Sequence, residues 1–236
     1  MTKNNQKPEL ISNAKELAVN SIFPTIQGEG PFSGEFAIFI RLAGCNLACP
    51  KCDTEYIKRQ MMTTREIISN VLDYSKGFNT LVVITGGEPF RQNIKQLILN
   101  LNSIGFRVQI ESNGTIAPPS GIIWNTVPHI RNGSFLVVSP KTGKIHDSIS
   151  NLALAFKYPI NKNYINPKDG LPTRILGVHV APARPNEKFK GEIYITPEDG
   201  NDLITSTAAN MREVAKIAME FGYIAQVQLH KILDIK

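Results

Sequence analysis

Apolar residues in this chain fall into short runs separated by longer amphipathic segments. The run over residues 36–42 is apolar at most positions, which is typical of a strand buried on both faces of a parallel sheet. Comparable runs predict further strands at residues 80–84, 106–111, 135–138, 192–195 and 224–229. The hydrophobic pattern therefore predicts a sheet of about six strands.

Helices are expected between these runs. Thr63 and Glu66 form a capping-box pattern at the start of a helix whose apolar residues recur at helical spacing. Two further helices are expected over residues 92–104, ended by Gly105, and over residues 208–221.

Strands and helices alternate along the chain, which predicts an α/β fold with a mainly parallel sheet. About six strands are too few for a closed eight-stranded barrel, so we expect an incomplete TIM-like barrel. We interpret residues 1–20 as a flexible extension and residues 21–236 as a single domain. An irregular insertion rich in Pro, Lys and Asn is expected at about 158–191.

Composition narrows the class of protein. The chain has 236 residues, of which 42% are hydrophobic, and a net charge of +6. Lysine and arginine are scattered rather than grouped, which favours ordinary surface charge over nucleic-acid binding and leaves an anionic substrate compatible. No apolar stretch reaches the ~20 residues of a membrane span, and the polar residues 1–20 do not look like a signal peptide. We expect a cytoplasmic protein without direct membrane or nucleic-acid contacts.

The three cysteines carry the first chemical signal. Cys45, Cys49 and Cys52 have the spacing Cys-x3-Cys-x2-Cys and lie in a loop directly after a predicted strand. Three thiolates can hold three irons of a [4Fe–4S] cluster and leave the fourth iron open, as cleavage of S-adenosylmethionine (SAM) requires. The alternative is a zinc site completed in space by one of the four histidines.

Motifs on both sides of the cysteines carry a family resemblance. They are residues 23–30 (FPTIQGEG), 39–47 (FIRLAGCNL), 52–54 (CDT), 85–89 (TGGEP), 111–115 (ESNGT), 139–141 (SPK) and 227–231 (VQLHK). From about residue 23 to its end the chain resembles the 7-carboxy-7-deazaguanine synthases, a radical SAM family. The resemblance implies a carbon–nitrogen lyase that contracts the ring of 6-carboxy-5,6,7,8-tetrahydropterin to 7-carboxy-7-deazaguanine, with loss of ammonia and with SAM regenerated.

The resemblance also implies site residues, though no catalytic side chain. Substrate binding falls to Ile26, Gln27, Gly28, Glu29, Arg41, Thr85, Glu111 and His230. SAM binding falls to Lys51, Cys52, Asp53, Gly87, Glu88, Ser139, Pro140, Lys141, Thr196, Pro197, Glu198 and Asp199. Cys45, Cys49 and Cys52 would hold the [4Fe–4S] cluster, and Thr54 would bind Mg²⁺. The implied partners are a one-electron donor such as flavodoxin or ferredoxin and a second copy in a homodimer.

Three positions depart from the family pattern. Lys51 stands where an aromatic residue usually meets the adenine of SAM, Thr196 stands where glutamine is common, and Ser112 replaces threonine. Residue chemistry alone leaves other interpretations open. Arg41 also fits a salt-bridged surface arginine, and His230 a structural histidine in the last strand.

Residues 27–29 also fit a simple glycine turn, and Thr54 fits a helix cap. Two other functions share part of the pattern. A glycyl-radical activating enzyme has the same cysteine spacing but acts on a protein, whereas the segment 27–30 with Arg41 suits a small carboxylated heterocycle. A zinc-binding or nucleic-acid-binding module would explain the positive charge, but the chain lacks a basic stripe interleaved with aromatic residues.

Overall fold

One twisted sheet runs through the whole described part of the chain. The computed structural model describes residues 16–52, 54–55, 57–130, 132–198 and 205–235. The strands are β1 (Glu16–Ile26), β2 (Phe36–Leu42), β3 (Gln60–Thr63), β4 (Leu81–Gly86), β5 (Arg107–Ser112), β6 (Gly133–Val138), β7 (Ala153–Ile160), β8 (Glu192–Pro197) and β9 (Ile224–Ala225). The helices are α1 (Thr64–Ser75), α2 (Lys95–Ser103), α3 (Ile149–Leu152), α4 (Thr205–Phe221), α5 (Leu229–Ile232) and a 3₁₀ turn at Pro89–Arg91.

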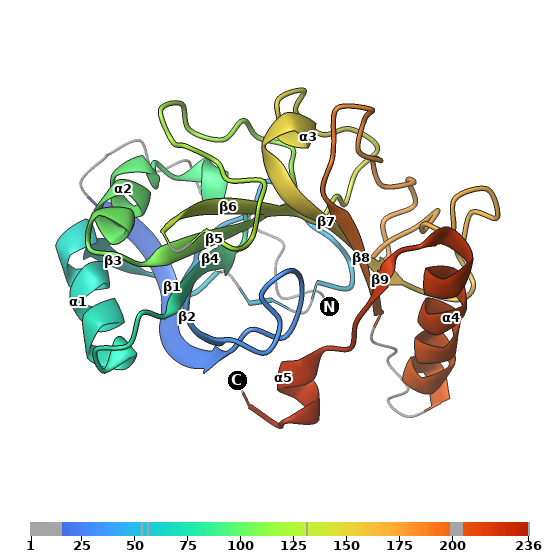
Figure 1. The fold of residues 1–236 in the computed structure, drawn as a ribbon, viewed down its shortest axis with the longest axis horizontal. Coiled ribbons are helices and arrows are strands. Elements are labelled where there is room, and N and C mark those ends of the chain that lie inside the picture. Colours follow the sequence, from blue (N-terminus) through green and yellow to red (C-terminus); the bar gives the residue numbers. More distant parts are fainter. Residues whose placement is uncertain (1–15, 53, 56, 131, 199–204, 236) are drawn as a thin grey trace.

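The strands lie in the order β3-β1-β2-β4-β5-β6-β7-β8-β9. From β2 to β9 every neighbouring pair is parallel, whereas β1 pairs antiparallel with both β2 and β3. This confirms an α/β fold with a mostly parallel sheet. In Figure 1, α1 and α2 cover the sheet beside β1 to β5, and α4 covers it beside β8 and β9.

The two faces of the sheet have different roles. The larger core cluster joins one face to α1, α2 and α4, with Ile38, Ile40 and Leu42 as its members from β2. Alternate residues point to the opposite face. That face is apolar where the strands begin, at Ala37, Leu81, Val83, Phe135 and Leu154 among others.

This opposite face, which we call the inner face, becomes polar where the parallel strands end. Arg41 follows Ala37 and Phe39 on it, and Arg41 lies beside Thr85 of β4 in the sheet register. Carboxyl ends of parallel strands meet at one edge, which is where α/β folds carry their sites. The polar residues therefore gather at that edge.

Three strands of the sheet were not predicted from the sequence. β1 begins at Glu16, so residues 16–20 are part of the sheet and not of a flexible extension, while residues 1–15 lie outside the described part. β3 is short, forms the edge of the sheet and pairs only with β1. β7 runs to Ile160, so the irregular segment begins after it and extends to the start of β8. β1 and β7 were missed because polar residues interrupt their apolar pattern.

The helix expected over residues 92–104 begins later, at Lys95. Gln92 is buried and uses its side-chain amide to bind the main chain instead of starting a helix. Its Oε1 accepts from the Ala18 N–H at 2.8 Å, and its Nε2 donates to the carbonyls of Ala18 and Ala43. The α1 capping box between Thr63 and Glu66 is confirmed.

The final strand is much shorter than expected. β9 ends at Ala225, and His230 lies in the short helix α5 rather than in a strand. The Gln226 side chain binds both backbone groups of Gly30, and the Leu229 N–H donates to Gly28. These bonds direct the C-terminal segment away from the sheet edge and towards the loop after β1. Among the described helices, none has the length and hydrophobicity that crossing a bilayer requires.

Candidate active site

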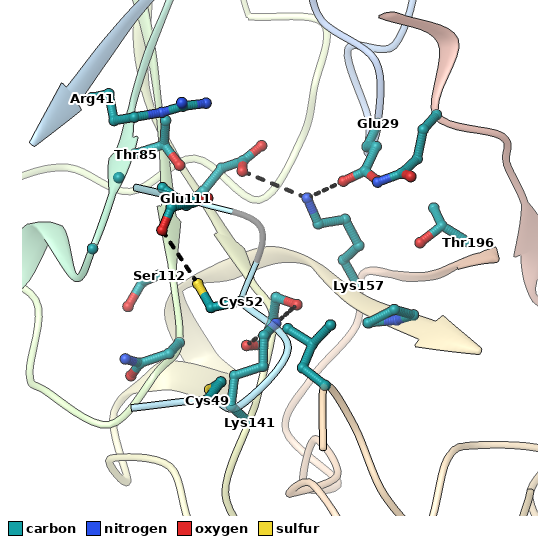
Figure 2. Close-up of a pocket in the computed structure, with 18 of the residues that line it drawn as sticks. Glu29, Arg41, Cys49, Cys52, Thr85, Glu111, Ser112, Lys141, Lys157 and Thr196 are labelled. Carbon is teal, nitrogen blue, oxygen red and sulfur yellow. Dashed lines mark hydrogen bonds and ion pairs between the residues drawn. The ribbon is translucent and has the colours of Figure 1, made fainter. Parts of the chain in front are cut away.

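A cavity of about 300 Å³ opens at the carboxyl ends of the parallel strands (Figure 2). The predicted residues that line it are Cys45, Cys49, Cys52, Thr54, Ile26, Gln27, Glu29, Arg41, Lys51, Thr85, Gly87, Glu111, Ser139, Lys141, Thr196, Pro197, Glu198 and His230. Residues from both ends of the chain therefore share one cavity.

Five predicted residues do not line the cavity or cannot be placed. Asp53 and Asp199 lie outside the described residues. Gly28, Glu88 and Pro140 are described but are not part of the cavity wall. A Cβ at Gly28 would lie 2.0 Å from Nδ1 of His230. Glycine at this position therefore leaves room for the His230 ring, which lines the cavity.

The cysteine loop forms one wall of the cavity. Cys45 is buried, and Cys49 and Cys52 are partly buried. Arg91 donates from Nη1 to the Cys45 carbonyl at 2.8 Å, which fixes the start of the loop. Burial raises the pKa of the Cys45 thiol to about 11 and also raises the pKa of Cys49, and neighbouring sulfur atoms act in the same direction.

The donor set fits an iron–sulfur cluster. In the ranges that the structure describes, no three His, Cys, Asp or Glu side chains converge as ligands of one metal ion would. The cysteines of a cubic cluster bind different irons, so they surround the cluster instead of converging on a point. Three free cysteines in one loop beside a cavity therefore suit a [4Fe–4S] cluster with one open iron better than a single zinc ion.

Two glycines at the end of β4 allow the cysteine loop to lie against that strand. A Cβ on Gly87 would lie 1.8 Å from the carbonyl oxygen of Gly44, and one on Gly86 would lie 2.2 Å from that of Leu42. The next residue, Glu88, donates its N–H to the Gly44 carbonyl at 2.9 Å. Any larger residue at Gly87 would displace the loop that carries Cys45.

Glu88 lies beneath the cavity and is fully buried. Its carboxylate accepts from the Asn113 N–H at 2.7 Å, from the Ser112 hydroxyl at 2.9 Å and from the Phe90 N–H at 3.1 Å. It therefore ties the end of β5 to the end of β4. Burial raises the pKa of Glu88 to about 7, although these three donors oppose the shift.

The Glu88 carboxyl should make the cluster-free protein less stable as the pH rises. Its folded pKa of about 7 exceeds the ordinary 4.5, so the folded state holds the proton more tightly. The stabilisation is complete below the ordinary pKa and is lost as the pH rises through the folded pKa. We expect the free energy of unfolding, measured in urea, to be lower by about 1–3 kcal/mol at about pH 8 than at about pH 5.5. In Glu88→Gln this difference should shrink; an unchanged pH dependence would contradict the assignment.

The opposite wall carries charged side chains that bind one another. Lys157 of β7 places Nζ 2.5 Å from Oε2 of Glu29 and 3.5 Å from Oε2 of Glu111 (Figure 2). Lys157 was missed in the sequence. The signal was available, since Lys157 interrupts an apolar strand just as Arg41 does.

Arg41 lies next to Thr85 in Figure 2, and Glu111 lies between it and Lys157. The Arg41 guanidinium lies over the Phe23 ring, 5.4 Å from the centroid. Its Nε atom is buried and has no hydrogen-bond partner among the described residues. A buried donor without a partner is costly, so this position suits a ligand that supplies an acceptor.

Between these walls lie the residues predicted to bind SAM. Lys141 donates to the Ser139 hydroxyl at 2.5 Å and to its carbonyl at 3.1 Å. The Lys51 side chain is 46% exposed, and its Nζ lies 4.0 Å from the carboxylate of Glu198. The Lys51 N–H donates to the carbonyl of Leu176 at 3.0 Å, so the irregular segment after β7 packs on the cysteine loop. Ammonium, hydroxyl and carboxylate groups in one cavity suit a ligand with carboxylate, ammonium and ribose groups.

Comparisons with known proteins agree with this arrangement. The model of a family described as "4Fe-4S single cluster domain" matches residues 26–133. The 7-carboxy-7-deazaguanine synthase of Rhodospirillum rubrum is 36% identical over 94% of this chain and 94% of its own length. That of Rickettsia prowazekii is 36% identical over 100% of this chain and 96% of its own. The crystal structure of QueE from Escherichia coli superposes with a TM-score of 0.64 at 21% identity, over 90% of this chain and 94% of that one.

The mostly parallel sheet, the three-cysteine loop at its carboxyl edge and the cluster-domain match define an iron–sulfur protein of the radical SAM class. The identity of 36% to two relatives, over 94% and 100% of this chain, then narrows this class to one family. The chain belongs to the 7-carboxy-7-deazaguanine synthase family.

Proposed function

We propose that this chain converts 6-carboxy-5,6,7,8-tetrahydropterin to 7-carboxy-7-deazaguanine with release of ammonia, as a carbon–nitrogen lyase of the radical SAM class. One observation carries the proposal beyond family membership. The cavity that the cysteine loop lines holds, towards one end, the Nε atom of Arg41, which is buried and has no hydrogen-bond partner among the described residues, and towards the other end the carboxylates of Glu29 and Glu111 bridged by Lys157. A heterocycle with a carboxylate at one end and N–H donors at the other matches these two ends of the cavity.

The site residues divide by the part of the ligands that they would bind. Arg41, beside Thr85, would bind the substrate carboxylate. Glu29 and Glu111 would accept hydrogen bonds from the pyrimidine N–H groups, and Gln27 and His230 would close that end. Ile26 and Gly28 belong to the same loop and would lie against the ring.

Cys45, Cys49 and Cys52 would hold the [4Fe–4S] cluster, and cluster and SAM together would supply the 5′-deoxyadenosyl radical. SAM would be held by a set around the loop: Lys51, Asp53, Gly87, Glu88, Ser139, Pro140, Lys141, Thr196, Pro197, Glu198 and Asp199. Glu88 would act through the backbone that it fixes, because its carboxylate binds Ser112 and Asn113 of the cavity wall and does not itself line the cavity. The protein's own contribution is placement and exclusion of water.

Further parts of the proposal concern the assembly. We propose that Thr54 binds Mg²⁺, that a flavodoxin or ferredoxin supplies electrons, and that the chain forms a homodimer in the cytoplasm. We also propose that the open sheet is an incomplete TIM-like barrel. The position of Thr54 on the cavity wall, two residues after Cys52 in the chain, supports the magnesium assignment.

An anaerobic assay tests the activity. Cluster-loaded protein, reductant, SAM, Mg²⁺ and the carboxytetrahydropterin should yield product with deazaguanine absorbance, and SAM should not be consumed in proportion to product. Omitting SAM or the reductant should abolish product. A protein that cleaves SAM in the presence of reductant but forms no deazaguanine would refute the substrate assignment while leaving the radical SAM class intact.

A further inference from the structure

The buried lysine of β7 is absent from the predicted site, yet it occupies the centre of the charged wall. Lys157 is only 8% exposed, and its two neighbours in the strand, Phe156 and Tyr158, are fully buried. Burying an ammonium is expensive unless it is paired. Lys157 is paired twice, with Glu29 from the loop after β1 and with Glu111 from β5. It therefore joins three segments that are distant in the sequence.

The remaining carboxylate oxygens are also held. Gln228 donates to Oε1 of Glu29 at 2.8 Å. Oε1 of Glu111 accepts from Gln109 at 2.9 Å and from Gln27 at 3.2 Å. All of these partners are donors, so the protein arranges both carboxylates as hydrogen-bond acceptors with fixed orientation. Such a wall recognises ligand groups that carry N–H hydrogens.

Lys157 decides whether both carboxylates can remain acceptors. Glu29 and Glu111 are both partly buried, and two such negative charges repel one another unless a cation lies between them. Burial alone would raise the pKa of Glu29, but Lys157 and Gln228 lower it to about 2. The two carboxylates in turn raise the pKa of Lys157 despite its burial. Other charged groups at the cavity are Arg41, His230, Lys51, Lys141 and Glu198.

We propose that Lys157 is a specificity-determining positioning residue: by bridging Glu29 and Glu111 it makes this wall accept the N–H groups of a 2-aminopyrimidinone and reject the matching 2-oxo compound. The inference rests on the proposed function and deepens it. Lys157 acts through the two carboxylates and does not itself take part in the reaction. A purely structural ion bridge would support the sheet but would not select between the two ligands.

The test uses cluster-loaded protein with SAM present and two stable probes, 6-carboxypterin and 6-carboxylumazine, which differ in the 2-amino and 2-oxo groups. Dissociation constants are measured by quenching of ligand fluorescence. A hydrogen bond to a charged group contributes about 1.5–3 kcal/mol, so the wild type should prefer carboxypterin by about 10–100-fold. In Lys157→Met the preference should fall to a few-fold, through weaker carboxypterin binding, with SAM affinity unchanged. Lys157→Arg should restore most of it.

Arg107→Met is the matched control, because Arg107 forms a partly exposed ion pair with Glu35 at the opposite end of β5. It should keep the wild-type preference. If Lys157→Met does not fold, Lys157→Gln, which keeps an N–H but no charge, should show the same loss. An unchanged preference in the Lys157 variants, or a parallel loss of SAM and carboxypterin affinity, would overturn the role of Lys157 alone. Wild-type protein that neither binds carboxypterin nor converts the substrate would overturn the proposed function as well.

Discussion

Cys49→Ser is expected to lose its iron–sulfur cluster and all turnover while keeping its fold. The residue lies in the loop after β2, outside every strand and helix, and is only partly buried. Serine removes a thiolate ligand at small steric cost. The two remaining cysteines would bind only two of the four irons, so the cluster would no longer be held. Anaerobic iron and sulfide analysis should therefore fall from near four of each per chain towards zero, with circular dichroism unchanged.

Pro50→Ala is the matched control for this variant. Pro50 is exposed and is the next residue in the same loop, but it offers no metal ligand. It should retain iron, sulfide and SAM cleavage close to the wild type. Full iron content in Cys49→Ser, or stoichiometric zinc in the wild type, would contradict the cluster assignment and would favour a different metal at this loop.

The cysteine loop and the strand ends could be predicted because their signals are local. The spacing of Cys45, Cys49 and Cys52, and the motifs that follow β4, β5 and β6, lie directly after apolar runs. The carboxyl-edge rule for parallel strands then places them together without any knowledge of distances. The cavity does bring these segments together.

Other parts of the site depend on contacts between distant segments. In the sequence, Lys157 is a charged residue within an apolar strand, and only the structure shows that Glu29 and Glu111 pair with it. His230 reaches the cavity because Gln226 and Leu229 bind the loop after β1, a pairing that no local pattern encodes. Glu88 resembles a cavity residue in sequence, but its carboxylate is taken up by β5 donors below the cavity. Such partners are decided by tertiary packing and not by spacing.

Arg41→Ala is expected to weaken substrate binding strongly and SAM binding little. Arg41 is the last residue of β2 that points to the inner face, and its Nε lacks a partner in the described part of the chain. A substrate carboxylate would satisfy this donor through a charge-assisted bond, which is among the stronger hydrogen bonds in proteins. Its loss should cost about 1.5–3 kcal/mol, which corresponds to about 10–100-fold in the dissociation constant of 6-carboxypterin.

Arg174→Ala provides the comparison, since Arg174 also lies over an aromatic ring, 5.1 Å from the Tyr164 centroid, but is not on the cavity wall. It should leave both affinities unchanged. Arg41→Lys should recover part of the lost affinity, because lysine restores the charge but not the planar fork that binds both carboxylate oxygens. Titrations with pterin lacking the 6-carboxylate separate the two explanations: the wild type and Arg41→Ala should bind it equally. If Arg41→Ala instead weakens both pterins and SAM alike, Arg41 supports the wall of the cavity and does not recognise the carboxylate.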